Sequence, residues 1–334
     1  MQPFAYARAA ALPEALAAAA KPGTAFLAGG TELLNWMRLG IAAPARILDI
    51  TPLPGLDAIE TMPNGGLRLG ALARLNEVAL APAVAARAPV LAEAILKAAS
   101  AQLRNLATIG GNLLQKTRCA YFRAAEPLPC NKRLPGSGCA ARDGMNDRHA
   151  IFGWSDACVA TQPSDPAVAL AALDAVVVTA RPGGTRRIPL TEFHLLPNGD
   201  PARETILEPG ELITAIEIPA PAPRSTYIKL RERESYEYAT VSVALALDLD
   251  SARRIARARV ALGSVAARPW RLPATERALA GLPPDAPAVR AAVEAGFADA
   301  RPLAHNAHKI TLARNLVLRA LRLAAEMAPA ETTS

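Results

Sequence analysis

The four cysteines of this 334-residue chain, Cys119, Cys130, Cys139 and Cys158, lie within a single 40-residue stretch. Four cysteines placed at random would share so narrow a window about one time in a hundred, so their clustering indicates shared chemistry. Successive cysteines are separated by 10, 8 and 18 residues, without a C-x2-C pair, which argues against a zinc ribbon and the common ferredoxin signatures. The spacing leaves four interpretations open: an iron-sulfur cluster, a zinc site, disulfides, or unrelated buried thiols.

Two glycine-rich turns lie ahead of the cysteines along the chain. Gly29 and Gly30 follow a short apolar run and precede a helical pattern, and Gly110 and Gly111 occur shortly before the first cysteine. Backbone N–H groups at such turns can face a pyrophosphate, because glycine permits a close approach and the start of a helix favours negative charge. The first turn lacks the G-x-G-x-x-G spacing of a Rossmann fold and, taken alone, could be only a turn. Two such turns before one group of cysteines indicate a phosphate-binding site more strongly than either turn alone.

The first fifty residues alternate helix and strand signals that would position the first turn. The pattern predicts a helix at 13–20, a buried strand at 25–28, a helix at 32–38 and a strand at 46–50. This alternation is typical of a small α/β unit.

A second α+β unit follows, with strands at 67–70 and 175–179 and helices within 78–98. Between them, residues 112–166 contain the cysteines and show little periodicity. An irregular stretch of this length inside a compact domain is uncommon unless it binds something, which independently supports a cofactor.

A proline-rich connector at 219–223 predicts a domain boundary. Strand-like runs follow at 227–231, 240–249 and 257–262, and the chain then turns helical, with an amphipathic helix at about 310–327. Strands followed by helices predict an α+β layer pair.

The composition excludes several classes of protein. The net charge is +7, but only 6 of the 37 basic residues are lysines and aromatic residues make up 4%, so we expect no nucleic-acid partner. The apolar run at 12–20 is short and contains Glu14, which predicts a surface helix and no membrane span. No basic region precedes an apolar one at the N-terminus, so the sequence predicts no secretory signal.

Three motifs resemble the FAD-binding subunit of the molybdenum hydroxylases, the xanthine dehydrogenase family. They are FLAGGTEL at 26–33, LRNLATIGGN at 103–112 and PSD at 163–165. The segments around the cysteines are similar to an insertion that carries a [4Fe-4S] cluster in the flavoprotein subunit of the periplasmic aldehyde oxidoreductases. The resemblance covers nearly the whole chain.

The resemblance implies an α+β fold with a two-part FAD-binding domain of the PCMH/VAO-like type, followed by a C-terminal α+β flavoprotein domain. We expect the first FAD-binding subdomain at 1–55 and the second at 56–218, with the iron-sulfur insertion at about 113–160. A domain similar to the CO dehydrogenase flavoprotein would span 219–330.

The resemblance also implies which residues bind FAD. The backbone of the first turn would hold the pyrophosphate, the second turn would lie on the phosphate side, and Asp165 would accept a hydrogen bond from an FAD hydroxyl. The implied set is Phe26, Leu27, Ala28, Gly29, Gly30, Thr31, Glu32, Leu33, Thr108, Gly111, Asn112, Asp165, Ile213, Lys229 and Tyr236, with Glu237 and Tyr238 as further ring-facing candidates. The residues alone also allow a helix cap at Asp165, a core residue at Ile213 and a solvated lysine at Lys229.

By the same resemblance, Cys119, Cys130, Cys139 and Cys158 would bind the [4Fe-4S] cluster, because soft thiolates suit iron and its sulfides. The nearby basic residues would favour the reduced cluster, or they are solvated loop charges; they are Arg118, Arg123, Lys132 and Arg133. His149 could be an alternative ligand, but four cysteines complete a site, so we expect it to pack in the loop.

The implied function is electron transfer within a molybdenum-dependent aldehyde oxidoreductase, with a molybdenum-cofactor large subunit, a [2Fe-2S] small subunit and an external electron acceptor as partners. FAD and a [4Fe-4S] cluster are the implied cofactors. The complex would be periplasmic, exported by a partner's signal, or cytoplasmic. A stand-alone flavin oxidase and a zinc- or disulfide-stabilised binding module are the alternatives.

Overall fold

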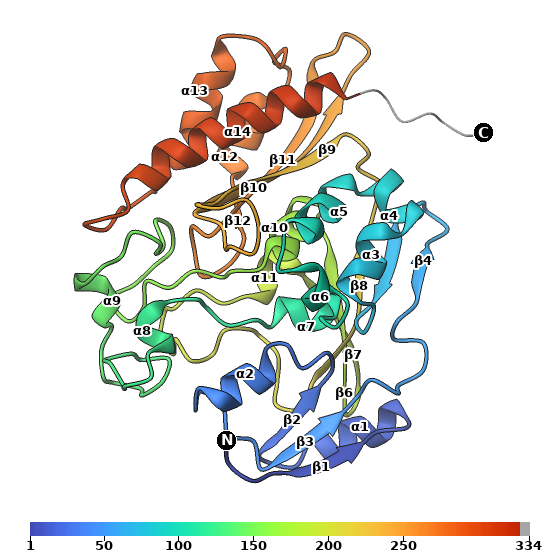
Figure 1. Ribbon diagram of the computed structural model, residues 1–334. Coiled ribbons are helices and arrows are strands. Elements are labelled where there is room, and N and C mark those ends of the chain that lie inside the picture. Colours follow the sequence, from blue (N-terminus) through green and yellow to red (C-terminus); the bar gives the residue numbers. More distant parts are fainter. Residues whose placement is uncertain (328–334) are drawn as a thin grey trace.

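The computed structural model describes residues 1–327 of the chain (Figure 1). The first sheet is parallel, in the order β1 (Ala5–Arg8), β3 (Arg46–Asp49) and β2 (Thr24–Leu27). Two helices, α1 (Leu12–Ala19) and α2 (Leu33–Arg38), make the connections that parallel strands require. The turn with Gly29 and Gly30 therefore lies at the carboxyl end of β2.

The second sheet is antiparallel, in the order β4 (Ile59–Thr61), β5 (Leu67–Gly70), β8 (Leu212–Ile218), β6 (Val176–Arg181) and β7 (Gly184–Pro189). Every residue of β8 is buried. This strand lies between β5 and β6 and so brings together segments more than a hundred residues apart in the sequence.

Helices surround this sheet. The larger ones are α3 (Leu75–Leu80), α4 (Pro82–Arg87), α5 (Pro89–Leu96) and α10 (Asp165–Ala172), and every residue of α10 is buried. Five further helices of this segment have only four or five residues, namely α6 (Ala101–Arg104), α7 (Ile109–Leu113), α8 (Ala120–Arg123), α9 (Ala140–Asp143) and α11 (Leu190–Phe193). Only α8 and α9 occur between Gln115 and Ser164, so the long irregular stretch around the cysteines is present as predicted.

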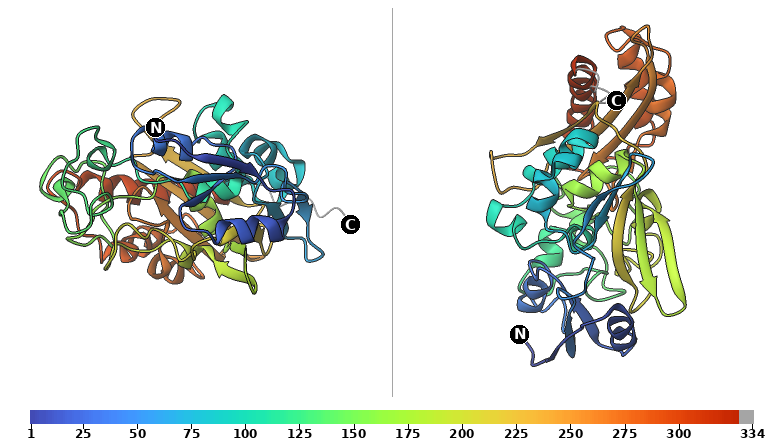
Figure 2. Two further views of the ribbon diagram at one scale, coloured as in Figure 1. Left: turned by 90° about the horizontal axis from the view of Figure 1, so that it is seen from below. Right: turned by 90° about the vertical axis from the view of Figure 1, so that its right-hand side faces the viewer.

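The third sheet is antiparallel, in the order β12 (Trp270–Arg271), β11 (Ile255–Gly263), β10 (Val241–Leu249) and β9 (Ser225–Leu230). It packs against helices on both faces (Figure 2). The outer helical elements are α12 (Pro273–Leu279), α13 (Ala288–Glu294), the 3-10 helix η1 (Ala295–Phe297) and α14 (His308–Glu326).

Strand β10 shows how the sequence produces this layering. Val243 and Leu245 belong to the apolar core shared with α14, whereas Ala244 and Ala246 belong to the core shared with α5 and α10. Successive side chains of a strand point to opposite faces, so the bulky residues fill one interface and the small residues allow the helices close approach on the other.

The structure confirms the predicted α+β class. Each sheet lies within one of the predicted segments 1–55, 56–218 and 219–330, although the boundaries themselves stay a prediction and residues 328–330 lie outside the described part. The suggestion that Asp165 caps a helix was wrong, because Ser164 is the N-cap and its hydroxyl accepts a hydrogen bond from the Ala167 N–H at 3.1 Å. Among residues 1–327, no helix combines the length and apolarity needed to cross a bilayer.

Candidate functional site

A cavity of about 340 Å³ lies where the two glycine-rich turns meet. All eight predicted residues of the first turn line it, and Thr108, Gly111, Asn112 and Ile213 line it as well. The structure therefore brings together twelve of the fifteen residues that were predicted to bind a cofactor.

Close backbone packing holds the two turns together. A Cβ atom on Gly29 would lie 1.9 Å from the carbonyl oxygen of Leu106, and one on Gly110 would lie 2.7 Å from the Cβ of Ala71. Gly30 has a φ of +71°, which L side chains rarely adopt. Glycine is thus required here for the approach of one backbone to another and for the shape of the turn.

The second turn is fixed by hydroxyl groups. Thr108 caps α7 by accepting a hydrogen bond from the Gly111 N–H at 3.2 Å. The Ser164 hydroxyl donates to Oδ1 of Asn112 at 2.5 Å, so the cap of α10 also orients a residue of the cavity wall. These contacts position the turn before any ligand binds.

A second cavity, of about 580 Å³, adjoins the first and shares Gly30, Glu32 and Tyr238 with its wall. The predicted ring-facing residues Lys229 and Tyr236 line this second cavity. Two adjoining cavities, with the first glycine turn at their junction, suit an elongated dinucleotide such as FAD.

Asp165 lines neither cavity and is instead the centre of a buried polar group. Its carboxylate pairs with Nζ of Lys229 at 2.8 Å and accepts a hydrogen bond from the Tyr227 hydroxyl. Burial raises the pKa of Asp165, and the ammonium of Lys229 opposes that rise. The side chain of Lys229 is 1% exposed, so it is not a solvated lysine, and Tyr227, which sequence reasoning missed, completes the group.

The four cysteines line one small cavity in the irregular segment. All four are free thiols. Burial raises the pKa of Cys119 to about 11, and the interaction between the Cys139 and Cys158 thiols lowers the pKa of Cys139 to about 6 and raises that of Cys158. Nε2 of His149 lies 3.2 Å from Sγ of Cys119, so this histidine packs against a predicted ligand.

The arrangement of these thiols bears on what could bind. Among residues 1–327, no group of three or more His, Cys, Asp or Glu side chains converges as the ligands of a single metal ion would. The thiols surround a cavity instead of a point, and an iron-sulfur cluster is larger than one ion and takes four thiolates. The four thiols are the donor set that an iron-sulfur cluster takes, and the cavity that they line is small, at about 10 Å³.

The basic residues near the cysteines are engaged in contacts and are not simply solvated. Arg118 and Arg123 both pair with the Glu32 carboxylate, Lys132 pairs with Glu204 at 2.9 Å, and Nη1 of Arg133 donates to a backbone carbonyl. These pairs attach the cysteine segment to the rest of the protein.

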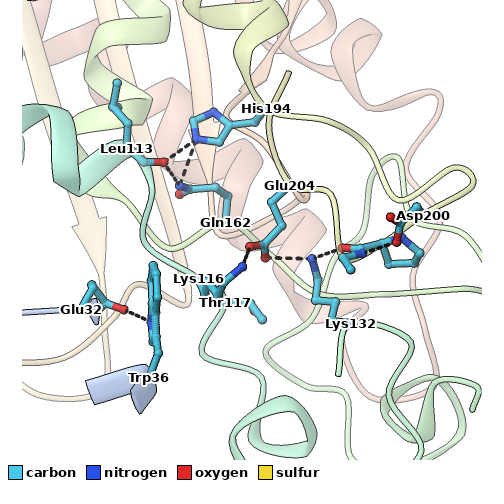
Figure 3. A network of polar contacts seen from close by, with 12 residues as sticks. Glu32, Trp36, Leu113, Lys116, Thr117, Lys132, Gln162, His194, Asp200 and Glu204 are labelled. Atoms are coloured by element: carbon cyan, nitrogen blue, oxygen red, sulfur yellow. Dashed lines mark hydrogen bonds and ion pairs between the residues drawn. The ribbon is translucent and has the colours of Figure 1, made fainter. Parts of the chain in front are cut away.

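Figure 3 shows one of these attachments. The Glu204 carboxylate lies between the ammonium groups of Lys116 and Lys132, and Nε1 of Trp36 donates to Glu32 at 2.7 Å. Nearby, Nε2 of the buried His194 lies 2.8 Å from the carbonyl oxygen of Leu113. Glu204 and Trp36 escaped sequence reasoning, because no local pattern marks a residue whose partners are distant in the chain.

Family models match nearly the whole chain. Residues 2–221 match the FAD binding domain in molybdopterin dehydrogenase, and residues 226–324 match the CO dehydrogenase flavoprotein C-terminal domain. The chain is 46% identical to the aldehyde oxidoreductase FAD-binding subunit PaoB of Escherichia coli K12, over 96% of this chain and 98% of that protein. It is 29% identical to the carbon monoxide dehydrogenase medium chain of Hydrogenophaga pseudoflava, over 89% and 88% of the two chains.

Solved structures show the same fold. A chain of CO dehydrogenase from Oligotropha carboxidovorans superimposes with a TM-score of 0.76 at 24% identity, covering 98% of this chain and 99% of that one. A chain of carbon monoxide dehydrogenase from Hydrogenophaga pseudoflava gives a TM-score of 0.74 at 28% identity, covering 97% and 98%.

Proposed function

The chain belongs to the FAD-binding subunits of the molybdenum hydroxylases, an oxidoreductase family, and we propose that it is the electron-transferring subunit of an aldehyde-oxidising complex. The family membership confirms the resemblance predicted from the sequence. The aldehyde substrate class is inferred from the relative of 46% identity, which is named as an aldehyde oxidoreductase subunit.

The proposal includes a [4Fe-4S] cluster on the four cysteines. The observation that supports it is that Cys119, Cys130, Cys139 and Cys158 line one cavity although up to 39 positions separate them in the sequence. Thiolates stabilise iron-sulfur clusters, and the buried position of two of these cysteines would limit access of water.

Both cofactors would supply redox chemistry, since flavins connect one-electron and two-electron transfer and clusters carry single electrons. The residues of the chain bind and orient them. The glycine turns would hold the FAD phosphates, Lys229 pairs with Asp165 at the wall of the second cavity, and Tyr238 lines both cavities.

The substrate-oxidising chemistry would belong to partner subunits. We infer a molybdenum-cofactor large subunit, a [2Fe-2S] small subunit and an external electron acceptor, because the relatives are named as subunits or medium chains of oxidoreductases.

Cofactor analysis of the purified complex tests the cluster. Replacing one ligand, Cys130→Ser, should remove about four iron and four acid-labile sulfide atoms per chain relative to the wild type, as loss of a [4Fe-4S] cluster requires. Comparison with the wild type cancels the iron of any partner subunit. Ala120→Ser is the matched control, because it places a serine at an exposed position beside Cys119 and leaves all four thiols in place. Unchanged iron and sulfide in Cys130→Ser, or zinc in their place, would refute the cluster.

A further inference from the structure

The loop of residues 231–240, which we call the tyrosine loop, connects β9 to β10. It forms one side of the second cavity, which Lys229 and Tyr236 line. Tyr236 has a φ of 53° and is 57% exposed, and Tyr238 lies at the junction of the two cavities. A loop of this shape needs contacts from other segments to keep one conformation. Two arginines of the cysteine segment provide such contacts.

Arg118 is the first of them and immediately precedes Cys119. Its guanidinium lies 4.6 Å from the centre of the Tyr238 ring, and Nη2 pairs with the Glu32 carboxylate of the first glycine turn. One side chain therefore contacts both the tyrosine loop and the first glycine turn. The side chain of Arg118 is 21% exposed, so solvent screens these contacts only in part.

Arg148 is the second, and it contacts the tyrosine loop at two points. Nη2 lies 2.6 Å from Oε2 of Glu232 and Nη1 lies 3.3 Å from Oε1 of Glu237. A single guanidinium thus links the beginning of the loop to its far side. Because Arg148 is about half exposed, each ion pair by itself contributes little, and the link depends on how firmly the backbone of Arg148 is held.

That backbone is held from two directions. His149, the next residue, contacts Sγ of Cys119 through Nε2. From the other side, Nζ of Lys309 donates to the carbonyl oxygens of Arg148 at 3.1 Å and His149 at 2.8 Å. Both arginines therefore lie one residue away either from Cys119 or from the histidine that touches it.

We propose that the cysteine site and the FAD site are energetically coupled through Arg118 and Arg148. A ligand on the four thiols fixes Cys119 and the packing of His149. The neighbouring residues Arg118 and Arg148 then keep their contacts with the tyrosine loop, and Arg118 keeps its contact with Glu32. These contacts hold the walls of the two cavities in the conformation that binds FAD. An empty cysteine site releases Cys119, so FAD binds more weakly. Coupling is reciprocal, so bound FAD also strengthens cluster retention. The inference rests on the proposed function, because the ligand of the thiols is taken to be the cluster.

The FAD dissociation constant of the complex measures this coupling. It is determined by equilibrium dialysis and quantification of released FAD, for the cluster-loaded wild type and for Cys130→Ser. We expect FAD to bind at least about fivefold more weakly without the cluster, the lower end of the usual range of coupling between two sites. If Cys130→Ser does not fold, extraction of iron from the wild type with a chelator supplies the cluster-free protein.

Arginine variants test the route of the coupling. In the double variant Arg118→Met and Arg148→Met, FAD should bind weakly in both states, and loss of the cluster should change its affinity by less than about twofold. Replacing Arg148 by lysine instead of methionine, Arg148→Lys, keeps the positive charge and should therefore restore part of the coupling that the double variant loses. Arg142→Met is the matched control, because Arg142 lies in the same segment and pairs with Asp143 and Asp156, away from the FAD cavities. In Arg142→Met, the ratio of the FAD dissociation constants without and with the cluster should equal that of the wild type.

The outcomes separate the two proposals. Unchanged iron and acid-labile sulfide contents in the Cys130→Ser complex would overturn both the cluster and the coupling. A cluster that is lost in Cys130→Ser without any change in FAD affinity would overturn the coupling alone. A full effect of cluster loss in the double arginine variant would show that these two residues do not carry it, and would also overturn the inference.

Discussion

Glu32 shows how one side chain joins the two predicted cofactor sites. It was predicted only as part of a backbone turn, yet its carboxylate accepts a hydrogen bond from Trp36 and pairs with Arg118 and Arg123. The carboxylate is 20% exposed and its two arginine partners are 21% and 15% exposed, so these pairs are less screened than surface ion pairs. Arg118 and Arg123 therefore neutralise the negative charge that Glu32 places at the first glycine turn.

Gly29 gives the sharpest residue-scale prediction. In Gly29→Ala the new Cβ would overlap the carbonyl oxygen of Leu106, which cannot rotate away because it belongs to the backbone. The two glycine turns must separate, so we expect the FAD content of the purified protein to fall by at least about half and its stability to decrease by about 1–3 kcal/mol. FAD release after denaturation and urea unfolding measure the two effects.

Gly40→Ala is the control for backbone strain. Gly40 has a φ of +66°, a positive value that Gly29 does not share, and no atom lies within 4 Å of a Cβ added to Gly40. This variant should lose about 1 kcal/mol of stability from strain and retain its FAD. Equal loss of FAD in both variants would show that the contact with Leu106 does not matter.

Sequence reasoning found the residues whose signals are local. Glycine turns and cysteines stand out within short windows, so Gly30, Thr108 and Cys130 could be predicted and lie at the cavities. Trp36, Glu204 and Tyr227 could not, because their roles depend on partners that only the fold brings close. The same reason explains why Lys229 was open to interpretation as a surface residue.

At the scale of elements, strands with continuous apolar runs and helices with clear periodicity were predicted well. The predicted final helix at 310–327 corresponds to α14, which begins two residues earlier. Strand β1 was missed, because all four of its residues are exposed and carry no alternation. The central strand of the second sheet, β8, was also missed, because Thr214 and Glu217 interrupt its apolar run and its burial on both faces removes the alternating pattern.

The first turn of α14 contains a buried lysine that makes the stability of the protein depend on pH. Nζ of Lys309 donates to the carbonyl oxygens of Arg148, His149 and Ser264. Burial lowers the pKa of Lys309 to about 7, with Asp147 opposing and Arg148 assisting the shift. An exposed lysine in the unfolded chain keeps a pKa near 10.4.

The sign of the effect follows from proton binding. Between about pH 7 and pH 10.4 the unfolded chain binds a proton on Lys309 that the folded chain does not, so the free energy of unfolding rises with pH in this window. In Lys309→Met this contribution is absent. We expect the stability advantage of the wild type over Lys309→Met to grow between pH 7 and pH 9.5, as measured by urea unfolding.

Arg322→Met is the control for loss of a cation from α14, because Arg322 is exposed. The difference in the free energy of unfolding between Arg322→Met and the wild type should not vary with pH in this window. A pH-independent difference for Lys309→Met as well would mean that Lys309 has an ordinary pKa in the folded protein.

At the scale of the whole molecule, the apolar cores are unequal. The core of the first sheet contains only seven buried apolar residues, and two of them, Leu72 and Leu212, come from the second subdomain. The other two cores are larger and share β10, which contributes to one of them through each face. The first subdomain is therefore expected to be the least stable part of the described chain.

The cavity proposed to bind FAD lies between this weak part and the rest of the protein. Its wall combines the turn after β2 with the α6–α7 region and β8, so a ligand there would bridge the two subdomains. A ligand that binds only the folded state stabilises it by about 2.7 kcal/mol at a hundred times its dissociation constant. The stabilisation should concentrate where folding is otherwise weakest.

Hydrogen exchange with mass spectrometry tests this expectation. Added to FAD-depleted protein, FAD should slow amide exchange in β2, β3 and α2 by at least about tenfold, because these elements can no longer open without releasing the ligand. Peptides from the middle of α14 are the internal control, since they pack on the far face of the third sheet and should change little. Uniform protection across both regions would contradict the expectation, because it would mean that the first subdomain opens only when the whole protein unfolds.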